Sequence, residues 1–206
     1  VPPCALVQNN GSPLLPACVS HGRRRMLENA GLAFESRAPG VDWMRIRHKA
    51  RQAGHAAAAT ALELARAKAL AITNWDGLVI GADQMLSCQG RWYDKPATLQ
   101  DAQAQLEALR GHTHCLHTAV GLARHGQVVW RHIEEPRLSM RAFSDLFLAR
   151  YLQAEGAQCL ASVGAYRLEG PGLLLFSHIE GDSFTIQGLP MLALMATLRQ
   201  MNVLLD

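Results

Sequence analysis

The sequence predicts an α/β fold, in which helices and strands alternate along the chain. A long stretch rich in Ala and Leu and free of proline, from Ala53 to Ile72, predicts a helix. The apolar run Leu78-Val79-Ile80 then predicts a strand, and helical and strand-like segments continue to alternate after it. With 206 residues, of which 49% are hydrophobic, the chain can bury a substantial core.

The other segments are assigned from their composition. Residues 1–13 contain three prolines and the pair Asn9-Asn10, so we expect an irregular leader, followed by one domain over residues 14–206. Leu14–Val19 is a short apolar segment, and Arg23–Ala30 predicts a helix that ends at Gly31. Further helices are expected over residues 99–109, 144–152 and 189–204, and strands over residues 112–123, 127–141 and 173–179.

Charge and cysteine usage exclude several classes of protein. A net charge of +3 is too small to indicate nucleic-acid binding, and no aromatic-rich strand accompanies the arginines. The five cysteines are dispersed without a C-x-x-C pair, which argues against a disulfide framework. No apolar run approaches the roughly 18 residues of a membrane span, and the first ten residues do not resemble a secretory signal. We therefore expect a cytoplasmic protein without a membrane anchor.

The segment Gly81-Ala82-Asp83-Gln84 is the most informative local feature. It places a carboxylate just past the expected strand at residues 78–80, where α/β folds usually bind their ligands. An Asp at such a position can bind a divalent metal or activate a water molecule. An ordinary turn would account for the same residues, so the segment alone leaves both interpretations open.

Several cations could accompany that carboxylate. Ser20 precedes Arg23-Arg24-Arg25 at an expected helix start, which is a common place for phosphate contacts. Successive helical residues are rotated by about 100°, so only one or two of the three arginines can face one ligand. Lys68, in the long helix, and Lys95, before a proline, are further candidates, although a solvent-facing role would explain each lysine equally well.

Three histidines lie close together in the sequence. On a strand, His112 and His114 share one face while His117 points to the other, so the three cannot converge on one metal. No Cys or carboxylate is spaced to complete such a set. The sequence therefore predicts no zinc site here.

Taken together and in order, these segments resemble the Maf family of nucleotide pyrophosphatases over nearly all of residues 14–200. The matching segments are Ala17-Cys18-Val19-Ser20, Leu64-Ala65-Arg66-Ala67-Lys68-Ala69, Gly81-Ala82-Asp83, Lys95-Pro96, Gly111-His112-Thr113-His114, Gly164-Ala165-Tyr166, Glu180-Gly181-Asp182 and Gly188-Leu189-Pro190. The resemblance implies an elongated mixed sheet flanked by helices, with a nucleotide cleft and often a homodimer. It also implies hydrolysis of the α–β phosphoanhydride of nucleoside triphosphates, which releases a monophosphate and pyrophosphate.

The resemblance also implies roles for individual residues. Asp83 would be the proton acceptor and a ligand of a divalent metal, Mg²⁺ or Mn²⁺. Lys68, Lys95 and Arg23 would hold the triphosphate, and Ser20 would cap it. This set suits the chemistry, because a breaking triphosphate needs cations and a carboxylate with a metal can generate hydroxide.

This chain departs from the family pattern in two places. The family usually reads Ala-Ser-x-Ser-Pro-Arg-Arg in the first loop, where this chain has Cys18, His21 and Gly22 in place of the first Ser, the Pro and the first Arg. Trp43 stands where a functional Glu is expected, next to Asp42. These departures motivate a second hypothesis, a catalytically impaired nucleotide-binding regulator of septum formation or cell division.

The preferred base stays open. Gln84 and Glu169 are similar to the residues of members that act on 7-methyl-GTP, where a carboxylate can accept the guanine N–H donors. Gly81-Ala82 and Gly164-Ala165-Tyr166 are instead similar to the members that hydrolyse dTTP and UTP. The expected partner is therefore a nucleoside triphosphate of undetermined base.

Overall fold

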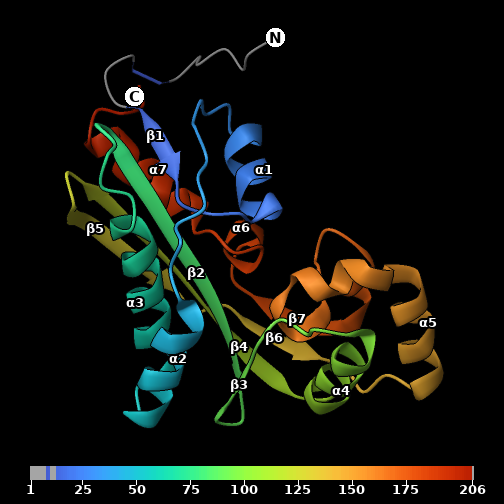
Figure 1. The fold of residues 1–206 in the computed structure, drawn as a ribbon. Coiled ribbons are helices and arrows are strands. Elements are labelled where there is room, and N and C mark those ends of the chain that lie inside the picture. The colour runs from blue at the N-terminus through green and yellow to red at the C-terminus, as the bar shows by residue number, and fades with distance from the viewer. Residues whose placement is uncertain (1–7, 10–12, 206) are drawn as a thin grey trace. The chain divides into compact units, whose positions relative to one another are not determined.

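Seven strands form one mixed sheet in the computed structural model, which describes residues 8, 9 and 13–205 (Figure 1). The strands are β1 (Leu14–Pro16), β2 (Leu78–Cys88), β3 (Arg91–Tyr93), β4 (Thr113–Arg124), β5 (Gln127–Glu134), β6 (Arg137–Met140) and β7 (Phe176–Glu180). The order is β1-β2-β4-β6-β7, with β3 paired to β2 and β5 paired to β4. β1 runs parallel to β2, whereas β3, β5, β6 and β7 make antiparallel pairs. The expected α/β class is confirmed.

The chain forms two compact units. The first comprises the described parts of residues 1–83, 118–134 and 188–206. Its helices are α1 (His21–Asn29), α2 (Trp43–Gln52), α3 (Ala57–Leu70) and α7 (Met191–Gln200). Its core joins Leu14 of β1, Leu27 of α1 and Leu198 of α7, each at most 1% exposed. Burial of these apolar side chains is the main stabilising contribution in this unit.

The second unit comprises residues 84–117 and 135–187. It contains α4 (Leu99–Leu109), α5 (Asp145–Glu155), α6 (Ser183–Ile186) and the 3-10 helices η1 (Gly156–Ala161), η2 (Val163–Ala165) and η3 (Pro171–Leu175). Leu106 and Leu116 are buried at its centre. The buried carboxylate of Glu155 accepts two hydrogen bonds from Arg167, at 3.0 and 3.2 Å, which offsets the cost of removing the charge from water.

Helix ends with local capping signals are confirmed. Thr98 and Asp101 form a reciprocal capping box at the start of α4, and Ser144 caps α5 through the amide of Phe147. Gly31, two residues after α1, has a φ of +75°, which glycine adopts without steric cost.

The expected helix over Ala53–Ile72 is wrong at its start. α3 begins at Ala57, and a separate helix, α2, covers residues 43–52. The side chain of Asp42 caps α2 by accepting from the amide of Arg45 at 3.0 Å. Gly54, with a φ of +69°, then separates the two helices. Trp43, Ile46 and Ala50 recur at helical spacing in α2, but basic residues outnumber them and Ala50 is the one buried residue of this helix.

Three further boundaries differ from expectation. The strand expected over residues 127–141 is divided into β5 and β6 by a short segment that contains Pro136. The strand expected over residues 173–179 begins as η3, and β7 is half-exposed to exposed rather than buried. The closing helix, expected over residues 189–204, ends at Gln200.

Residues 8 and 9, which belong to the expected leader, pair with the C-terminal segment. Gln8 makes an isolated bridge with Leu204, and the amide of Asn9 donates to the carbonyl of Val203 at 2.9 Å. The rest of the expected leader, residues 1–7 and 10–12, lies outside the described residues. The single domain over residues 14–206 stays a prediction. Within the described part of the chain, no helix has the length and apolar character of a membrane span.

Candidate functional site

The sequence suggested that Asp83 follows the end of a strand, but Asp83 lies within β2. β2 continues from Leu78 through Gly81 to Cys88. A Cβ atom at Gly81 would lie 2.2 Å from the carbonyl oxygen of Ala65 and 2.4 Å from the amide nitrogen of Ala69. Gly81 therefore does not break the strand. It lets the backbone of α3 pack directly against β2.

This close packing brings Asp83 to Lys68. Alternate residues of a strand share a face, so the side chain of Asp83 projects on the same side as Gly81, toward α3. Lys68 lies on α3 between the two residues that contact Gly81. Its Nζ atom is 2.5 Å from Oδ1 of Asp83, and the two side chains are only 15% and 14% exposed.

Arg23 is a second cation beside Asp83. Its Nη1 atom donates to the carbonyl oxygen of Ala82 at 3.2 Å, and Nζ of Lys68 donates to the same oxygen at 3.3 Å. Nε of Arg23 donates to the carbonyl of Gly188 at 2.7 Å, which fixes the guanidinium. Two cations and one carboxylate thus meet at consecutive residues of β2, and the group carries a net positive charge suited to an anionic ligand.

The first loop holds Arg23 in this position. The hydroxyl of Ser20 caps α1 by accepting from the amide of Arg23 at 3.5 Å. Arg24 instead pairs with Glu28 at 3.6 Å, with both side chains about half exposed, and Arg25 is exposed. Of the three arginines, Arg23 therefore contacts the carbonyl of Ala82, next to Asp83.

The second unit contains a hollow that is lined by both residues expected to select the base. Gln84 lies on one wall, and its amide donates to the carbonyls of Thr185 and Ile186 at 3.2 and 3.0 Å. Glu169 lines the same hollow, together with Tyr166. The hollow is polar enough to orient a ligand through hydrogen bonds.

Residues 13–201 match the family described as "Maf-like protein". The chain belongs to the Maf-like protein family. The resemblance read from the sequence motifs is thereby confirmed.

Curated relatives of this Maf-like chain carry enzyme names. A nucleoside triphosphate pyrophosphatase of Granulibacter bethesdensis is 48% identical over 193 residues, which cover 93% of this chain and 98% of the relative. One of Paramagnetospirillum magneticum is 49% identical over 183 residues, covering 88% of this chain and 94% of the relative. A 7-methyl-GTP pyrophosphatase of Rhizobium meliloti is 44% identical over 193 residues, covering 93% and 97%.

The positions at which this Maf-like chain departs from the family motif differ in their surroundings. Trp43 is the first residue of α2 and is 42% exposed, with the guanidinium of Arg47 5.6 Å from its ring. Asp42 caps the helix and pairs with Arg45 at 3.8 Å, so it is used locally. Gly22 faces open space and Cys18 is buried. Lys95 is exposed in the loop after β3, and its contact with phosphate stays a prediction.

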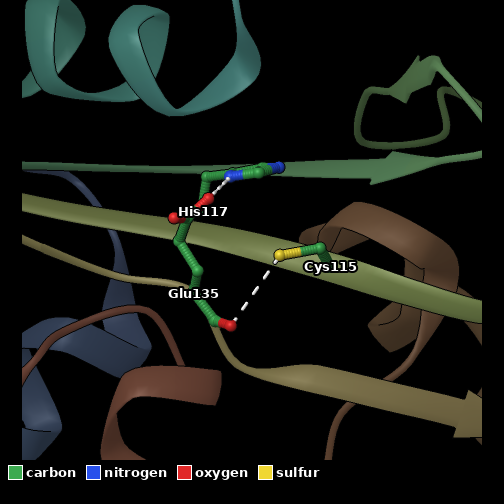
Figure 2. A group of neighbouring side chains, drawn as sticks. All are labelled: Cys115, His117 and Glu135. Atoms are coloured by element: carbon green, nitrogen blue, oxygen red, sulfur yellow. Dashed lines mark hydrogen bonds and ion pairs between the residues drawn. The ribbon is translucent and has the colours of Figure 1, made fainter.

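A divalent metal bound at Asp83 would take most of its remaining ligands from the substrate and water. Among the described residues, one group of three potential metal ligands is present, Cys115, His117 and Glu135, and Asp83 is not part of it (Figure 2). Mg²⁺ is commonly bound by one or two carboxylates together with substrate phosphates and water. The single carboxylate of Asp83 therefore fits a metal that arrives with the triphosphate.

The three clustered histidines do not converge, although their placement differs in part from the one expected. His112 precedes β4, whereas His114 and His117 lie on this strand. The ring of His112 contacts Gln89, that of His114 contacts Tyr166, and that of His117 contacts Glu135. The statement that no Cys or carboxylate could complete a ligand set with one of them is nevertheless wrong. Cys115 and Glu135 both approach His117, and Glu135 could not be found from local spacing because it follows the next strand.

Proposed function

We propose that this chain is a nucleoside triphosphate pyrophosphatase in which Asp83 is the proton acceptor. The convergence of Lys68 and Arg23 on the carbonyl of Ala82, next to the Asp83 carboxylate, is the observation that carries this proposal. The names of the relatives support hydrolysis over the regulatory alternative.

The side chains of this group divide the work of the reaction. Asp83 accepts a proton from the water that attacks the α-phosphorus, and the bond to the β-phosphate oxygen breaks as pyrophosphate leaves. Lys68 and Arg23 stabilise the negative charge that develops on the phosphates, and Lys95 and Ser20 add contacts to the triphosphate. A divalent metal, Mg²⁺ or Mn²⁺, held by Asp83 and the phosphates would neutralise further charge and lower the pKa of a bound water.

The base is proposed to bind in the hollow of the second unit. Gln84 and Glu169 both line it, and a carboxylate can accept the N–H donors of a guanine edge. This arrangement favours 7-methyl-GTP, whereas the Gly-Ala segments favour dTTP or UTP.

We further propose a cytoplasmic location, because the described cysteines, Cys18, Cys88, Cys115 and Cys159, are all unpaired. A homodimer is the expected assembly.

A nucleotide panel tests the proposal. Pyrophosphate release would be measured for 7-methyl-GTP, dTTP, UTP and the common nucleotides with Mg²⁺ or Mn²⁺. We expect metal-dependent release with at least one nucleotide and a loss of at least about 100-fold in Asp83→Asn, which keeps the shape of the side chain. Nucleotide binding by calorimetry without turnover of any nucleotide would instead support the impaired regulator.

A further inference from the structure

A thiol, an imidazole and a carboxylate lie close together in the second unit, and none of them has a part in the reaction proposed above. Cys115 and His117 are two residues apart on β4 and therefore project from one face of the strand. Glu135 lies in the connection between β5 and β6, which runs beside β4 because the amide of Leu116 donates to the carbonyl of Pro136 at 3.0 Å. The ligand atoms of the three side chains lie within 4.8 Å of one another (Figure 2).

We propose that Cys115, His117 and Glu135 bind a zinc ion. Zn²⁺ accepts mixed sulfur, nitrogen and oxygen ligands, and a tetrahedral site with three protein ligands keeps its fourth position for water. In such a site neighbouring ligand atoms are about 3.3–3.8 Å apart, as follows from metal–ligand distances of about 2.0–2.3 Å. The Nδ1 atom of His117 and the Oε1 atom of Glu135, 2.6 Å apart, therefore need to separate by about 0.7 Å or more. The thiol, which lies within 4.8 Å of them, needs to come closer by up to about 1 Å, and the half-exposed side chain of Glu135 can adjust to this geometry.

The surroundings of His117 are those of a metal ligand. Its Nδ1 atom is 2.6 Å from Oε1 of Glu135, and its Nε2 atom is 2.8 Å from the hydroxyl of Ser87. A hydroxyl can donate or accept, so Ser87 serves either tautomer of the ring. When Nδ1 turns its lone pair to the metal, Nε2–H donates to Ser87. Such a hydrogen bond to the second ring nitrogen orients most metal-binding histidines.

Ser87, His117 and Glu135 also have the order of a nucleophile, a base and an orienting acid. Ser87, however, is paired with Trp92 in the β2–β3 ladder, where main-chain amides serve strand pairing rather than forming an oxyanion hole. The thiol of Cys115 has no role in such a triad, whereas it completes a metal site. The geometry therefore favours zinc.

Zinc binding would be measured by calorimetry on the metal-stripped 206-residue chain without nucleotide. We expect one equivalent to bind, with affinity weakened at least about tenfold in Cys115→Ser and His117→Gln. His132→Gln is the matched control, because His132 pairs with Glu134 at 3.1 Å in the first unit and, among the described residues, belongs to no group of three potential metal ligands. Asp83→Asn should also retain zinc binding, which separates this site from the proposed catalytic residue.

Two spectroscopic and chemical readouts do not depend on the folding of a variant. Co²⁺ added to the unmodified chain should give a thiolate-to-cobalt charge-transfer band, and Zn²⁺ should slow alkylation of Cys115 but not of Cys159 when labelled peptides are analysed by mass spectrometry. Equal zinc affinity in Cys115→Ser, absence of the cobalt band, or unchanged alkylation would overturn the proposal. Labelling of Ser87 by a fluorophosphonate would overturn it in favour of a serine nucleophile.

Discussion

The carbonyl oxygen of Ala82 accepts hydrogen bonds from both Lys68 and Arg23, and Asp83 follows it directly. Lys68→Gln keeps a donor of similar length but removes the charge that faces Asp83 and the phosphates. We expect kcat/KM for the preferred nucleotide to fall about 100- to 1000-fold, the usual effect of removing one preorganised electrostatic contact. Arg66→Gln on the same helix, where Arg66 pairs with exposed Glu63 at 3.2 Å, serves as the control and should change kcat/KM by less than about twofold.

His114 should make the stability of the second unit depend on pH. Burial lowers the pKa of His114 from 6.5 to about 4. Between these two pH values the ring is therefore mostly neutral in the native state and mostly protonated in the unfolded chain. The free energy of unfolding therefore decreases as the pH falls from 6.5 toward 4, by about 2–3 kcal/mol at the acid end, and this loss is absent above about pH 7.5.

Urea unfolding of the unmodified chain and of His114→Gln at about pH 4.5 and about pH 7.5 measures this effect. Glutamine can still contact the hydroxyl of Tyr166, which lies 2.8 Å from Nε2 of His114, but it does not titrate. The variant should lose less stability than the unmodified chain between the two pH values. An equal loss in both proteins would contradict the assignment to His114.

The family motifs singled out Asp83, Lys68 and Arg23, and the structure places Lys68 against Asp83 and Arg23 at the carbonyl of Ala82. The catalytic and binding roles of these residues stay predictions. The pairing of Cys115 with Glu135 was missed because it depends on the return of the chain between β5 and β6 beside β4. No local spacing encodes that contact.

The contact between β2 and α3 fixes the distance between Asp83 and Lys68. Gly81→Ala would place a Cβ atom 2.2 Å from the backbone carbonyl of Ala65, so the helix and strand must separate. We expect the free energy of unfolding to fall by about 1–3 kcal/mol or more, because backbone atoms cannot rotate away as a side chain can. Urea denaturation followed by circular dichroism measures this change.

Gly121 on β4 is the matched control for Gly81. A Cβ atom there would have its nearest neighbour, the carbonyl of Trp130, at 3.7 Å, which is an ordinary contact. Gly121→Ala should therefore change the free energy of unfolding by less than about 0.5 kcal/mol or stabilise slightly. A similar loss in both variants would show that close packing of α3 is not the reason for Gly81.

Elements were predicted well where their signals are local. α4 and α5 begin at capping residues that the sequence displays, and α1 ends close to Gly31. β2 was cut short at residue 80 because a glycine usually interrupts a strand, whereas Gly81 here makes room for the backbone of the preceding helix, α3. α2 was missed because basic residues outnumber the apolar residues that recur at helical spacing along it.

The motifs predicted the family and fold class of the whole molecule more accurately than the sequence predicted the boundaries of single helices and strands. The ordered resemblance from residue 14 to 200 predicted the family and the mixed α/β sheet, and both are confirmed. The sequence shows no composition shift or linker that would indicate the two compact units. The reason is that each unit is assembled from segments that alternate along the chain. The first unit contains Asp83 with Lys68 and Arg23, and the second contains the hollow lined by Gln84 and Glu169.

Product analysis on the intact chain decides whether Asp83 directs cleavage between the α- and β-phosphates. The preferred nucleotide would be incubated with Mg²⁺ or Mn²⁺, and the products separated by ion-exchange chromatography, for the unmodified chain and for Asp83→Asn with nucleotide binding verified by calorimetry. We predict equimolar monophosphate and pyrophosphate from the unmodified chain and neither product above background from the variant that still binds. Release of a diphosphate and orthophosphate, or undiminished turnover in Asp83→Asn, would contradict the proposed function.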